Sequence, residues 1–490
     1  MLTDTVSSSV EQTVIDTAPR GLFIDGEWRK TARTFPVFDP ATGDELCTVA
    51  DADAADGLTA LDAACAAQPD WARTAPRERA ELLMEVHRAL VADSDRLGLL
   101  ATLEMGKPLD EARREIAYAA EFFRWFAEEA VRIDGGYMPA PTGGSRFVVA
   151  RQPVGPSLLI TPWNFPMAMG ARKIAPALAA GCTCVVKPAE QTPLSMLALA
   201  EVIAAVGVPA GVVNVLTTTD PAALMTPLIH DHRSRKLSFT GSTTVGKQLL
   251  EQCARTVMRT SMELGGNAPV LVFADADIEV AVDGAVEAKM RNIGQACTAA
   301  NRFLVQRDVA DLFAQRLADR MAALPMGRGT KPDVVVGPLI DADAVAKVQR
   351  LVDDARARGA TVLTGGTAMD GPGTFYPATV LVDVPDEAEL CHTEIFGPVA
   401  AIGVFDTEDE AISRANDTPY GLVSYVFTES LRRGLRVSEA METGMVGLNQ
   451  GVVSNPAAPF GGVKESGLGR EGGPTGIDEF LETKYIGVRL

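Results

Sequence analysis

The segment from Gly294 to Arg302 reads Gly-Gln-Ala-Cys-Thr-Ala-Ala-Asn-Arg and places Cys297 among small residues. Small neighbours leave room for a substrate to reach the sulfur, and a thiolate attacks a carbonyl carbon without help from a metal. The alternative is a buried cysteine that acts as a small hydrophobic residue, which is the commoner situation for a lone cysteine. The other polar residues of the chain decide between these two interpretations.

Two of them supply what thiolate chemistry at a carbonyl requires. Asn164, in the proline-framed TPWNFP of residues 161–166, could donate its amide to the oxyanion that forms. Otherwise it is a turn asparagine beside proline. Glu263, directly before the LGGN of residues 264–267, could be the base that activates water. The alternative for Glu263 is a salt bridge at the end of a strand.

Other features could hold a dinucleotide. Lys187 and Glu190, in KPAE, close a strand where α/β sheets bind ligands, and together they could hold the hydroxyls of a ribose. In isolation, exposed surface charges are the commoner interpretation. The FTGSTTVGK of residues 239–247 predicts a strand, a glycine turn and a helix start, whose free N–H groups bind phosphate. Its spacing matches neither the GxGxxG fingerprint nor a P-loop.

The elements that would position these residues alternate between strand and helix patterns. A helix is expected from near Asp277, with Gly294 as its stop, because apolar residues recur at helical spacing. From Ser157 the alternation is typical of a parallel α/β sheet, and a second α/β lobe is expected after residues 265–266. Residues 135–155 suggest a hairpin that leaves the domain, and 484–490 a last strand.

Composition excludes several classes of protein. A chain of 490 residues is expected to form two or more lobes, and a net charge of −19 argues against nucleic acid and anionic membranes as partners. The seven cysteines and four histidines show neither a disulfide framework nor metal-site spacing, which predicts a reduced, intracellular protein without a metal. Neither a signal peptide nor a transmembrane helix is expected.

Together the motifs resemble those of the NAD(P)-dependent aldehyde dehydrogenases, over about residues 22–490. The matching motifs are TPWNFP at 161, KPAE at 187, FTGST at 239, MELGGNAP at 262, GQACTAANR at 294, EIFGPV at 394 and PFGGVKESGLGRE at 459. The resemblance implies an α/β fold with a Rossmann-type cofactor-binding domain, an α/β catalytic domain and a small β oligomerisation element. The expected boundaries are a disordered tail at 1–20, the cofactor-binding domain at 21–134 and 156–263, the catalytic domain at 264–470, and the oligomerisation element at 135–155 and 471–490.

By the same resemblance, Cys297 is the nucleophile, Asn164 the oxyanion donor and Glu263 the general base that hydrolyses a thioester. The implied cofactor residues are Thr161, Pro162, Trp163, Lys187, Glu190, Gly241, Ser242, Leu264, Glu394 and Phe396. NAD is the expected cofactor, with NADP possible, because Glu190 would repel a 2′-phosphate while Lys187 would partly neutralise it. The implied partners are a small aldehyde and a second or further copies of this chain, as a homodimer or homotetramer in the cytoplasm.

Within that family, ARKIAPALAAGCT, KMRNIGQAC and GVVSNPAAPFGG resemble the succinate-semialdehyde dehydrogenases most. That group clamps the far carboxylate of its substrate with two arginines and a serine, which correspond to Arg172, Arg291 and Ser454. Trp125 and Phe460 are expected to line the same tunnel. Bidentate guanidinium bonds suit a carboxylate. The alternatives are a surface cation for Arg172 and a helix C-terminal cation for Arg291.

One departure and several alternatives remain at this point. Members of the group often carry a second cysteine two residues after the nucleophile, but Ala299 stands there, so a redox switch is not expected. A dehydrogenase of glutarate semialdehyde or another ω-carboxy aldehyde would share the clamp, whereas a general aliphatic enzyme would not need it. A non-catalytic binding protein on this fold is disfavoured by the joint presence of Cys297, Glu263 and Asn164.

Overall fold

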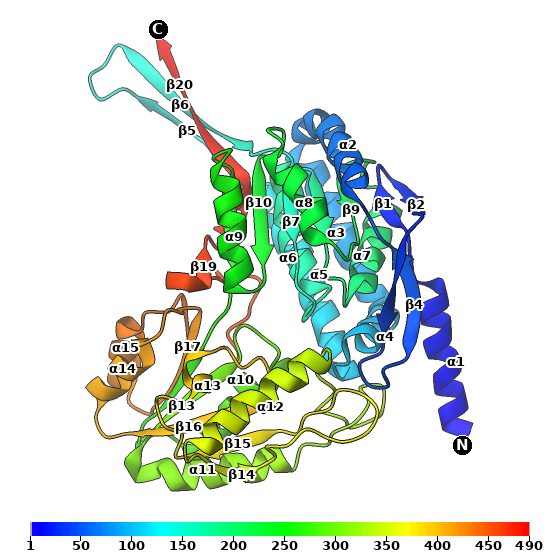
Figure 1. Cartoon of the computed structure of the whole chain (residues 1–490). Coiled ribbons are helices and arrows are strands. Elements are labelled where there is room, and N and C mark those ends of the chain that lie inside the picture. Colours follow the sequence, from blue (N-terminus) through cyan, green and yellow to red (C-terminus); the bar gives the residue numbers. More distant parts are fainter. Residues whose placement is uncertain (1, 490) are drawn as a thin grey trace.

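The computed structural model describes the main chain of residues 2–489 and the side chains of residues 9–489 (Figure 1). Met1 and Leu490, the outer ends of the expected tail and oligomerisation element, lie outside the described residues. Two large sheets form two lobes, and a smaller three-stranded sheet extends away from them. In residues 2–489 no helix combines the length and apolar character needed to cross a bilayer.

The first sheet has eight strands in the order β19-β11-β10-β7-β8-β9-β1-β2. Its five central strands are parallel, because a helical crossover connects each to the next, and they are β7 (Ser157–Ile160), β8 (Cys184–Lys187), β9 (Val213–Val215), β10 (Lys236–Thr240) and β11 (Arg259–Glu263). Antiparallel strands β1 (Leu22–Ile24), β2 (Glu27–Arg29) and β19 (Gly467–Leu468) close the two edges.

Helices pack on both sides of this sheet, as expected for parallel strands that are buried throughout. All thirteen residues of α6 (Ala168–Ala180) are buried, and its sequence is apolar apart from Arg172 and Lys173. The other helices of this lobe are α2 (Ala54–Arg73), α3 (Pro76–Ala92), α4 (Ser94–Met105), α5 (Leu109–Ala130), α7 (Pro193–Ala205), α8 (Pro221–His230) and α9 (Thr243–Ala254). A two-stranded sheet of β3 (Thr34–Phe38) and β4 (Glu45–Ala50) lies beside them.

The second sheet has seven strands in the order β14-β15-β16-β13-β12-β17-β18, and only the β14–β15 pair is antiparallel. The strands are β12 (Ala268–Val272), β13 (Ala300–Gln306), β14 (Thr361–Thr364), β15 (Thr379–Val382), β16 (Val399–Phe405), β17 (Val423–Phe427) and β18 (Met445–Leu448). Its helices are α10 (Ile278–Met290), α11 (Arg307–Ala322), α12 (Ala342–Ala357), α13 (Glu389–His392), α14 (Glu408–Asn416) and α15 (Leu431–Ala440). The α/β fold class expected from the sequence is therefore confirmed.

The third sheet joins the hairpin to the C-terminal strand. β6 (Ser145–Pro153) pairs antiparallel with β5 (Gly136–Pro139) and, along its whole length, with β20 (Leu481–Arg489). In Figure 1 this sheet projects from the body of the molecule. The hairpin and last strand predicted from the sequence are present and they lie side by side.

The N-terminal segment differs from the expected disordered tail, because residues 2–17 form helix α1 (Leu2–Thr17). Val14, Ile15 and Ala18 are buried in the core of the first lobe, where α1 packs against α4. Arg20 donates to the carbonyl oxygen of Ile15 at 2.9 Å and closes the helix end. Burial of this short apolar stripe, rather than the serine and threonine content that suggested disorder, decides the structure.

The expected boundary at residue 470 is also wrong. β19 pairs with β11 in the first sheet, with Gly467 opposite Glu263, so the chain returns to the first lobe before that boundary. The short helix η3 (Gly476–Phe480) then packs on α6, also in the first lobe. The C-terminal segment therefore crosses from the second lobe past the first before it reaches the projecting sheet.

Candidate active site

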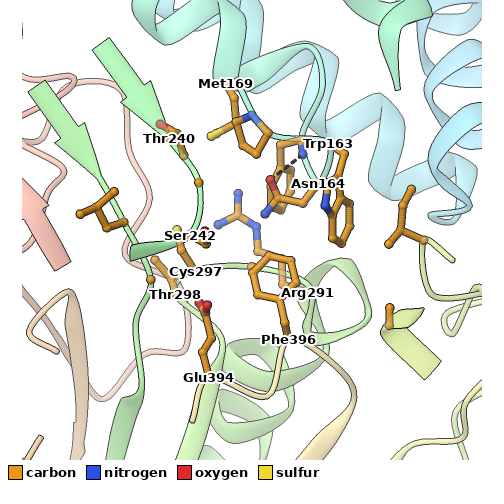
Figure 2. Close-up of a pocket in the computed structure, with 18 of the residues that line it drawn as sticks. Trp163, Asn164, Met169, Thr240, Ser242, Arg291, Cys297, Thr298, Glu394 and Phe396 are labelled. Atoms are coloured by element: carbon orange, nitrogen blue, oxygen red, sulfur yellow. Dashed lines mark hydrogen bonds between the residues drawn. The ribbon is translucent and has the colours of Figure 1, made fainter. Parts of the chain in front are cut away.

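A cavity of about 370 Å³ lies between the lobes, where the carboxyl ends of the first sheet meet loops of the second. Asn164 follows β7, Ser242 follows β10, Cys297 precedes β13 and Glu394 precedes β16. Figure 2 shows Cys297, Thr298, Ser242 and Glu394 gathered on one side, with Trp163 and Asn164 across from them. Thus the structure brings together residues from four motifs.

The cysteine loop has a strained start. Asp277 caps α10 by accepting hydrogen bonds from the Glu279 and Val280 N–H groups, as the sequence predicted for the helix start. The helix ends at Met290, however, four residues before the expected stop. Asn292 and Ile293 then adopt left-handed conformations, with φ of 53° and 60°. Such a conformation is costly for a β-branched residue, so buried contacts must maintain it, and sequence rules do not foresee it.

The Cys297 thiol is partly exposed and lines the cavity. Burial raises its pKa to about 12; Arg172 and Arg291 act to lower that pKa, whereas the carboxylates of Glu263 and Glu394 act to raise it. The protonated thiol is therefore the favoured form at neutral pH. A ligand or a nearby base must shift this balance before the sulfur can attack.

The side chain of Asn164 is held in one orientation. Its Nδ2 donates to the carbonyl oxygen of Gln295 at 2.9 Å, and its Oδ1 accepts from the Phe165 N–H at 3.1 Å. One amide hydrogen is thus committed to the loop that carries Cys297, and the second is left for a ligand in the cavity. This is the arrangement expected of an oxyanion donor, and a plain turn asparagine would not need it.

Glu263 ends β11 just behind the cavity wall. A Cβ at Gly461 would lie 2.9 Å from its Oε1, and its Oε2 is buried without a hydrogen-bond partner. Burial and the nearby Glu471 raise its pKa well above the usual range, against the lowering effect of Arg172, Lys173 and Arg470. The protonated form of the Glu263 carboxyl is therefore favoured, and its unpaired oxygen is free to bond to water or to a reacting group.

Glu471 partly neutralises the positive charges of Arg172 and Lys173. Its carboxylate forms buried ion pairs with both Arg172 and Lys173, and Lys173 also donates to Ser238 Oγ at 2.9 Å. Burial would raise the pKa of Glu471, but these two cations outweigh it and hold the pKa below its usual range. Arg172 also lies over the Phe460 ring, 4.2 Å from its centroid. Arg172 is therefore a buried, paired cation rather than a surface one.

Arg291 has a different environment on the same cavity. Its Nη1 donates to Ser454 Oγ at 2.9 Å. Its guanidinium carbon lies 5.0 Å from the ring centroid of Phe165 and 5.8 Å from that of Tyr118. The contacts of Arg291 are thus a hydroxyl and two rings, so its charge is available to an anion in the cavity.

The expected cofactor residues separate into two groups. Those on the cavity wall are Pro162, Trp163, Gly241, Ser242, Leu264, Glu394 and Phe396. The rings of Trp163 and Phe396 meet edge to face with centroids 5.3 Å apart, and Glu394 accepts from the Gly266 N–H at 3.2 Å. Burial raises the pKa of Glu394 to about 7. Thr161, Lys187 and Glu190 lie outside the wall, where Lys187 and Glu190 pair at 3.3 Å.

The residues present fit a dinucleotide. Helix α9 begins beside the cavity, with Ser242 as its N-cap, so its first N–H groups face the space that a pyrophosphate would occupy. The hydroxyls of Thr161 and Thr240 are buried without a partner. A Cβ at Gly265 would lie 3.1 Å from Glu394 Oε2 and 3.2 Å from Thr243 Oγ1. Glycine at this position therefore keeps the space between these two side chains open.

Sequence reasoning misplaced one wall residue and missed others. Trp125 packs against the core of the first lobe and is not among the residues that line the cavity, whereas Tyr118, two helical turns earlier on α5, is. The Tyr118 hydroxyl faces Arg172. Burial raises the pKa of Tyr118, and Arg172 acts to lower it.

Glu471 ends the motif quoted from residue 459, but its role depends on Arg172 and Lys173, nearly 300 positions away. The other wall residues not anticipated include Phe165, Met169, Thr298, Ile340, Asp341 and Lys347.

Alkylation of Cys297 by iodoacetamide should be slow at pH 7 in the cofactor-free protein and accelerate about tenfold per pH unit up to pH 10, since only the thiolate reacts. At pH values where Glu263 is ionised, Glu263→Gln removes a negative neighbour that raises the pKa of the thiol, so it should accelerate labelling there. Mass spectrometry of the Cys297 peptide measures both effects, with Cys297→Ser as the blank. A plateau below pH 9 would show that the thiolate is already formed.

Comparison with known proteins agrees with this geometry. Residues 28–486 match the aldehyde dehydrogenase family. The chain is 56% identical to a succinate-semialdehyde dehydrogenase of Paenarthrobacter nicotinovorans, over 90% of this chain and 98% of that protein, and 48% identical to a glutarate-semialdehyde dehydrogenase of Pseudomonas putida, over 95% and 96%. The crystal structure of an Escherichia coli NADP-dependent enzyme superposes with a TM-score of 0.96 at 48% identity, covering 97% of this chain and 99% of that one. The chain therefore belongs to the aldehyde dehydrogenase family and is an NAD(P)-dependent aldehyde dehydrogenase similar to the succinate-semialdehyde dehydrogenases.

Proposed function

We propose that this aldehyde dehydrogenase oxidises succinate semialdehyde to succinate, through a thiohemiacetal and a thioester on Cys297. The observation that carries the substrate assignment is Arg291, held by Ser454 on the wall of the cavity that also exposes Cys297. A cation there suits an aldehyde with a carboxylate at its far end. Glutarate semialdehyde is the second candidate, because a relative at 48% identity carries that name.

In the proposed reaction, the Cys297 thiol first loses its proton to solvent, and the thiolate then adds to the aldehyde carbon, so the carbonyl oxygen becomes negative. The free amide hydrogen of Asn164 and the N–H of Cys297 stabilise that oxygen. The nicotinamide, when bound, supplies the hydride acceptor. Glu263 then takes a proton from the water that cleaves the thioester and releases the sulfur. Burial and Glu471 favour the protonated form of Glu263, so the carboxyl must be ionised before it acts as a base.

The two arginines are not equivalent in this proposal. Arg291 is the principal partner of the substrate carboxylate, because its charge faces a hydroxyl and rings. Arg172 is the second partner, but it shares its charge with Glu471. Removal of Arg172 would also leave the buried Glu471 with Lys173 as its remaining partner, which affects the site for any substrate.

Arg291→Ala should lower kcat/KM for succinate semialdehyde by about 30-fold or more, since truncating one member of a buried, hydrogen-bonded charge pair costs about 2–5 kcal/mol. Butyraldehyde has no carboxylate to lose, so its kcat/KM should change little. Arg172→Ala should lower kcat/KM for both aldehydes. The measurement is cofactor reduction followed by absorbance, with glutarate semialdehyde as a third substrate. Equal losses for charged and neutral aldehydes with Arg291→Ala would refute the clamp, and a higher wild-type kcat/KM for glutarate semialdehyde would favour the second candidate.

NAD is proposed as the preferred cofactor over NADP. Glu190 pairs with Lys187 at 3.3 Å and would repel a 2′-phosphate next to it, whereas it accepts hydrogen bonds from ribose hydroxyls. Glu190→Gln should therefore raise the ratio of kcat/KM for NADP to that for NAD by about fivefold or more, the factor that corresponds to ~1 kcal/mol between unit charges 4 Å apart in water. A wild-type ratio that already favours NADP would overturn the proposal.

A homodimer or homotetramer is proposed on the basis of the projecting sheet. Tyr137 and Met138 on β5, and Tyr485 and Ile486 on β20, are exposed there. An apolar sheet that extends from the body is a liability unless another chain covers it. Light scattering that shows only a 51.8 kDa species would contradict this.

A cytoplasmic location is proposed as well. All seven cysteines are free, which fits a reducing compartment.

A further inference from the structure

We infer that Lys107 and Glu115 form a positioning pair that sets the location of Asn164 relative to Cys297. The inference rests on the proposed role of Asn164 as the oxyanion donor. Neither residue lines the cavity, so the pair acts through the loop that carries Asn164.

Lys107 is a fully buried cation in the short connection between α4 and α5. Its Nζ donates to the main-chain oxygen of Asn164 at 2.8 Å and to Glu115 Oε2 at 2.5 Å. The same ammonium lies 4.1 Å from the ring centroid of Phe165, the next residue of the loop. Lys107 therefore contacts the loop at two successive residues, one through a hydrogen bond and one through its charge.

Glu115, on α5, holds the other end of that loop. Its Oε1 accepts from the N–H groups of Met167 and Ala168 at 2.9 and 3.1 Å, which are at the start of α6. Met167, the N-cap of α6, offers no side-chain cap of its own. Glu115 thus supplies the missing cap from a neighbouring helix, and its charge is favourable at a helix N-terminus. One carboxylate thereby fixes both Lys107 and the point where the loop ends.

The cysteine loop supplies a second hydrogen bond to the main-chain oxygen of Asn164. Asn292 Nδ2 donates to the Asn164 main-chain oxygen at 2.8 Å and to the Gln295 oxygen at 3.0 Å. Asn164 is therefore located between an anchor in the first lobe, Lys107, and an anchor in the strained turn before Cys297. Without Lys107, the main-chain oxygen of Asn164 would keep only its hydrogen bond from Asn292. The Asn164 side chain would then shift whenever the turn before Cys297 moves.

Net stabilisation of the fold is a weak explanation for this pair. Burying two charges costs about as much as their attraction returns, so a buried ion pair is poor evidence of a contribution to stability. The pair instead fixes geometry, because every contact of its charged atoms named above falls on the Asn164 loop, on the start of α6 or on the partner. A misplacement of about 1 Å in an oriented catalytic group can lower the rate about 100-fold.

The test is a double-mutant cycle on the full-length enzyme with Lys107→Met, Asn164→Ala and the double variant. Lys107→Met should lower kcat for the aldehyde by about 30- to 100-fold. The Kd of the cofactor should stay within about twofold of the wild-type value, because Lys107 does not line the cavity. In the Asn164→Ala background, Lys107→Met should cost less than about threefold more, because the donor that it positions is already gone.

Lys236→Met is the matched control. Lys236 is also a fully buried lysine, bonded to Ser261 Oγ at 2.5 Å and to Glu479 Oε2 at 3.4 Å, with the Phe480 ring centroid 5.0 Å away. It lies outside the cavity wall, so its loss should change thermal stability and leave kcat within about threefold of wild type. If Lys107→Met does not fold, Glu115→Gln replaces it, because glutamine keeps an acceptor for α6 while weakening the hold on Lys107. That variant should lower kcat about three- to tenfold, again only when Asn164 is present.

The outcomes distinguish a failure of the positioning role of Lys107 from a failure of the proposed oxyanion role of Asn164. Losses that multiply fully in the double variant, or an equal loss in Lys236→Met, would reject the positioning role. Near-normal turnover of Asn164→Ala by itself would reject the proposed function of Asn164, whatever Lys107 does. A loss from Lys107→Met that vanishes without Asn164 supports the inference.

Discussion

The close approach of two main chains at Cys297 is the constraint on which the site depends. A Cβ at Gly266 would lie 2.5 Å from the Cys297 carbonyl oxygen, and a Cβ at Gly294 would overlap the carbonyl of Gly397. Glycine at these positions lets the end of the first sheet, the cysteine loop and the loop before β16 pack directly on one another. Cys297 and Glu394 line one cavity, with Glu263 directly behind its wall, because these segments of the main chain are in contact.

Electrostatics in this crowded region follow from the pairing of Arg172 with Glu471. That ion pair partly offsets the charge with which Arg172 lowers the pKa of Cys297 and of Glu263. Burial raises both pKa values and so favours the protonated forms of the two groups. Arg291, whose contacts are a hydroxyl and two rings, remains available to an anion in the cavity.

Much of this architecture could be predicted from the sequence, because it depends on local patterns. The hairpin within residues 135–155 and the last strand near the C-terminus are present as expected, since short runs of strand-forming residues between turn signals are strong evidence for strands. Arg259–Glu263 and the edge strand at 467–468 were not anticipated, because polar residues interrupt the first and the second has only two residues. Helix α1 was taken for a tail because its apolar stripe is narrow.

The candidate site was predictable wherever a motif carries the chemistry itself. Cys297, Asn164, Arg291 and Ser454 line one cavity, as the motifs indicated. Partnerships across long sequence separations were not predictable: Glu471 with Arg172, or Lys107 with the Asn164 main chain, depends on which helices pack together. No spacing rule encodes those contacts, since only the packed tertiary structure defines them.

The single uncommitted hydrogen on the Asn164 amide has a stereochemical consequence. Because the other hydrogen is held by the Gln295 carbonyl oxygen, the donor can point in only one direction across the cavity. An aldehyde oxygen that bonds to it presents a single face of its carbonyl carbon to the sulfur of Cys297. The tetrahedral adduct should therefore form as one enantiomer, with its carbon-bound hydrogen directed to one side of the cavity, although neither the aldehyde nor the carboxylic acid product has a stereocentre.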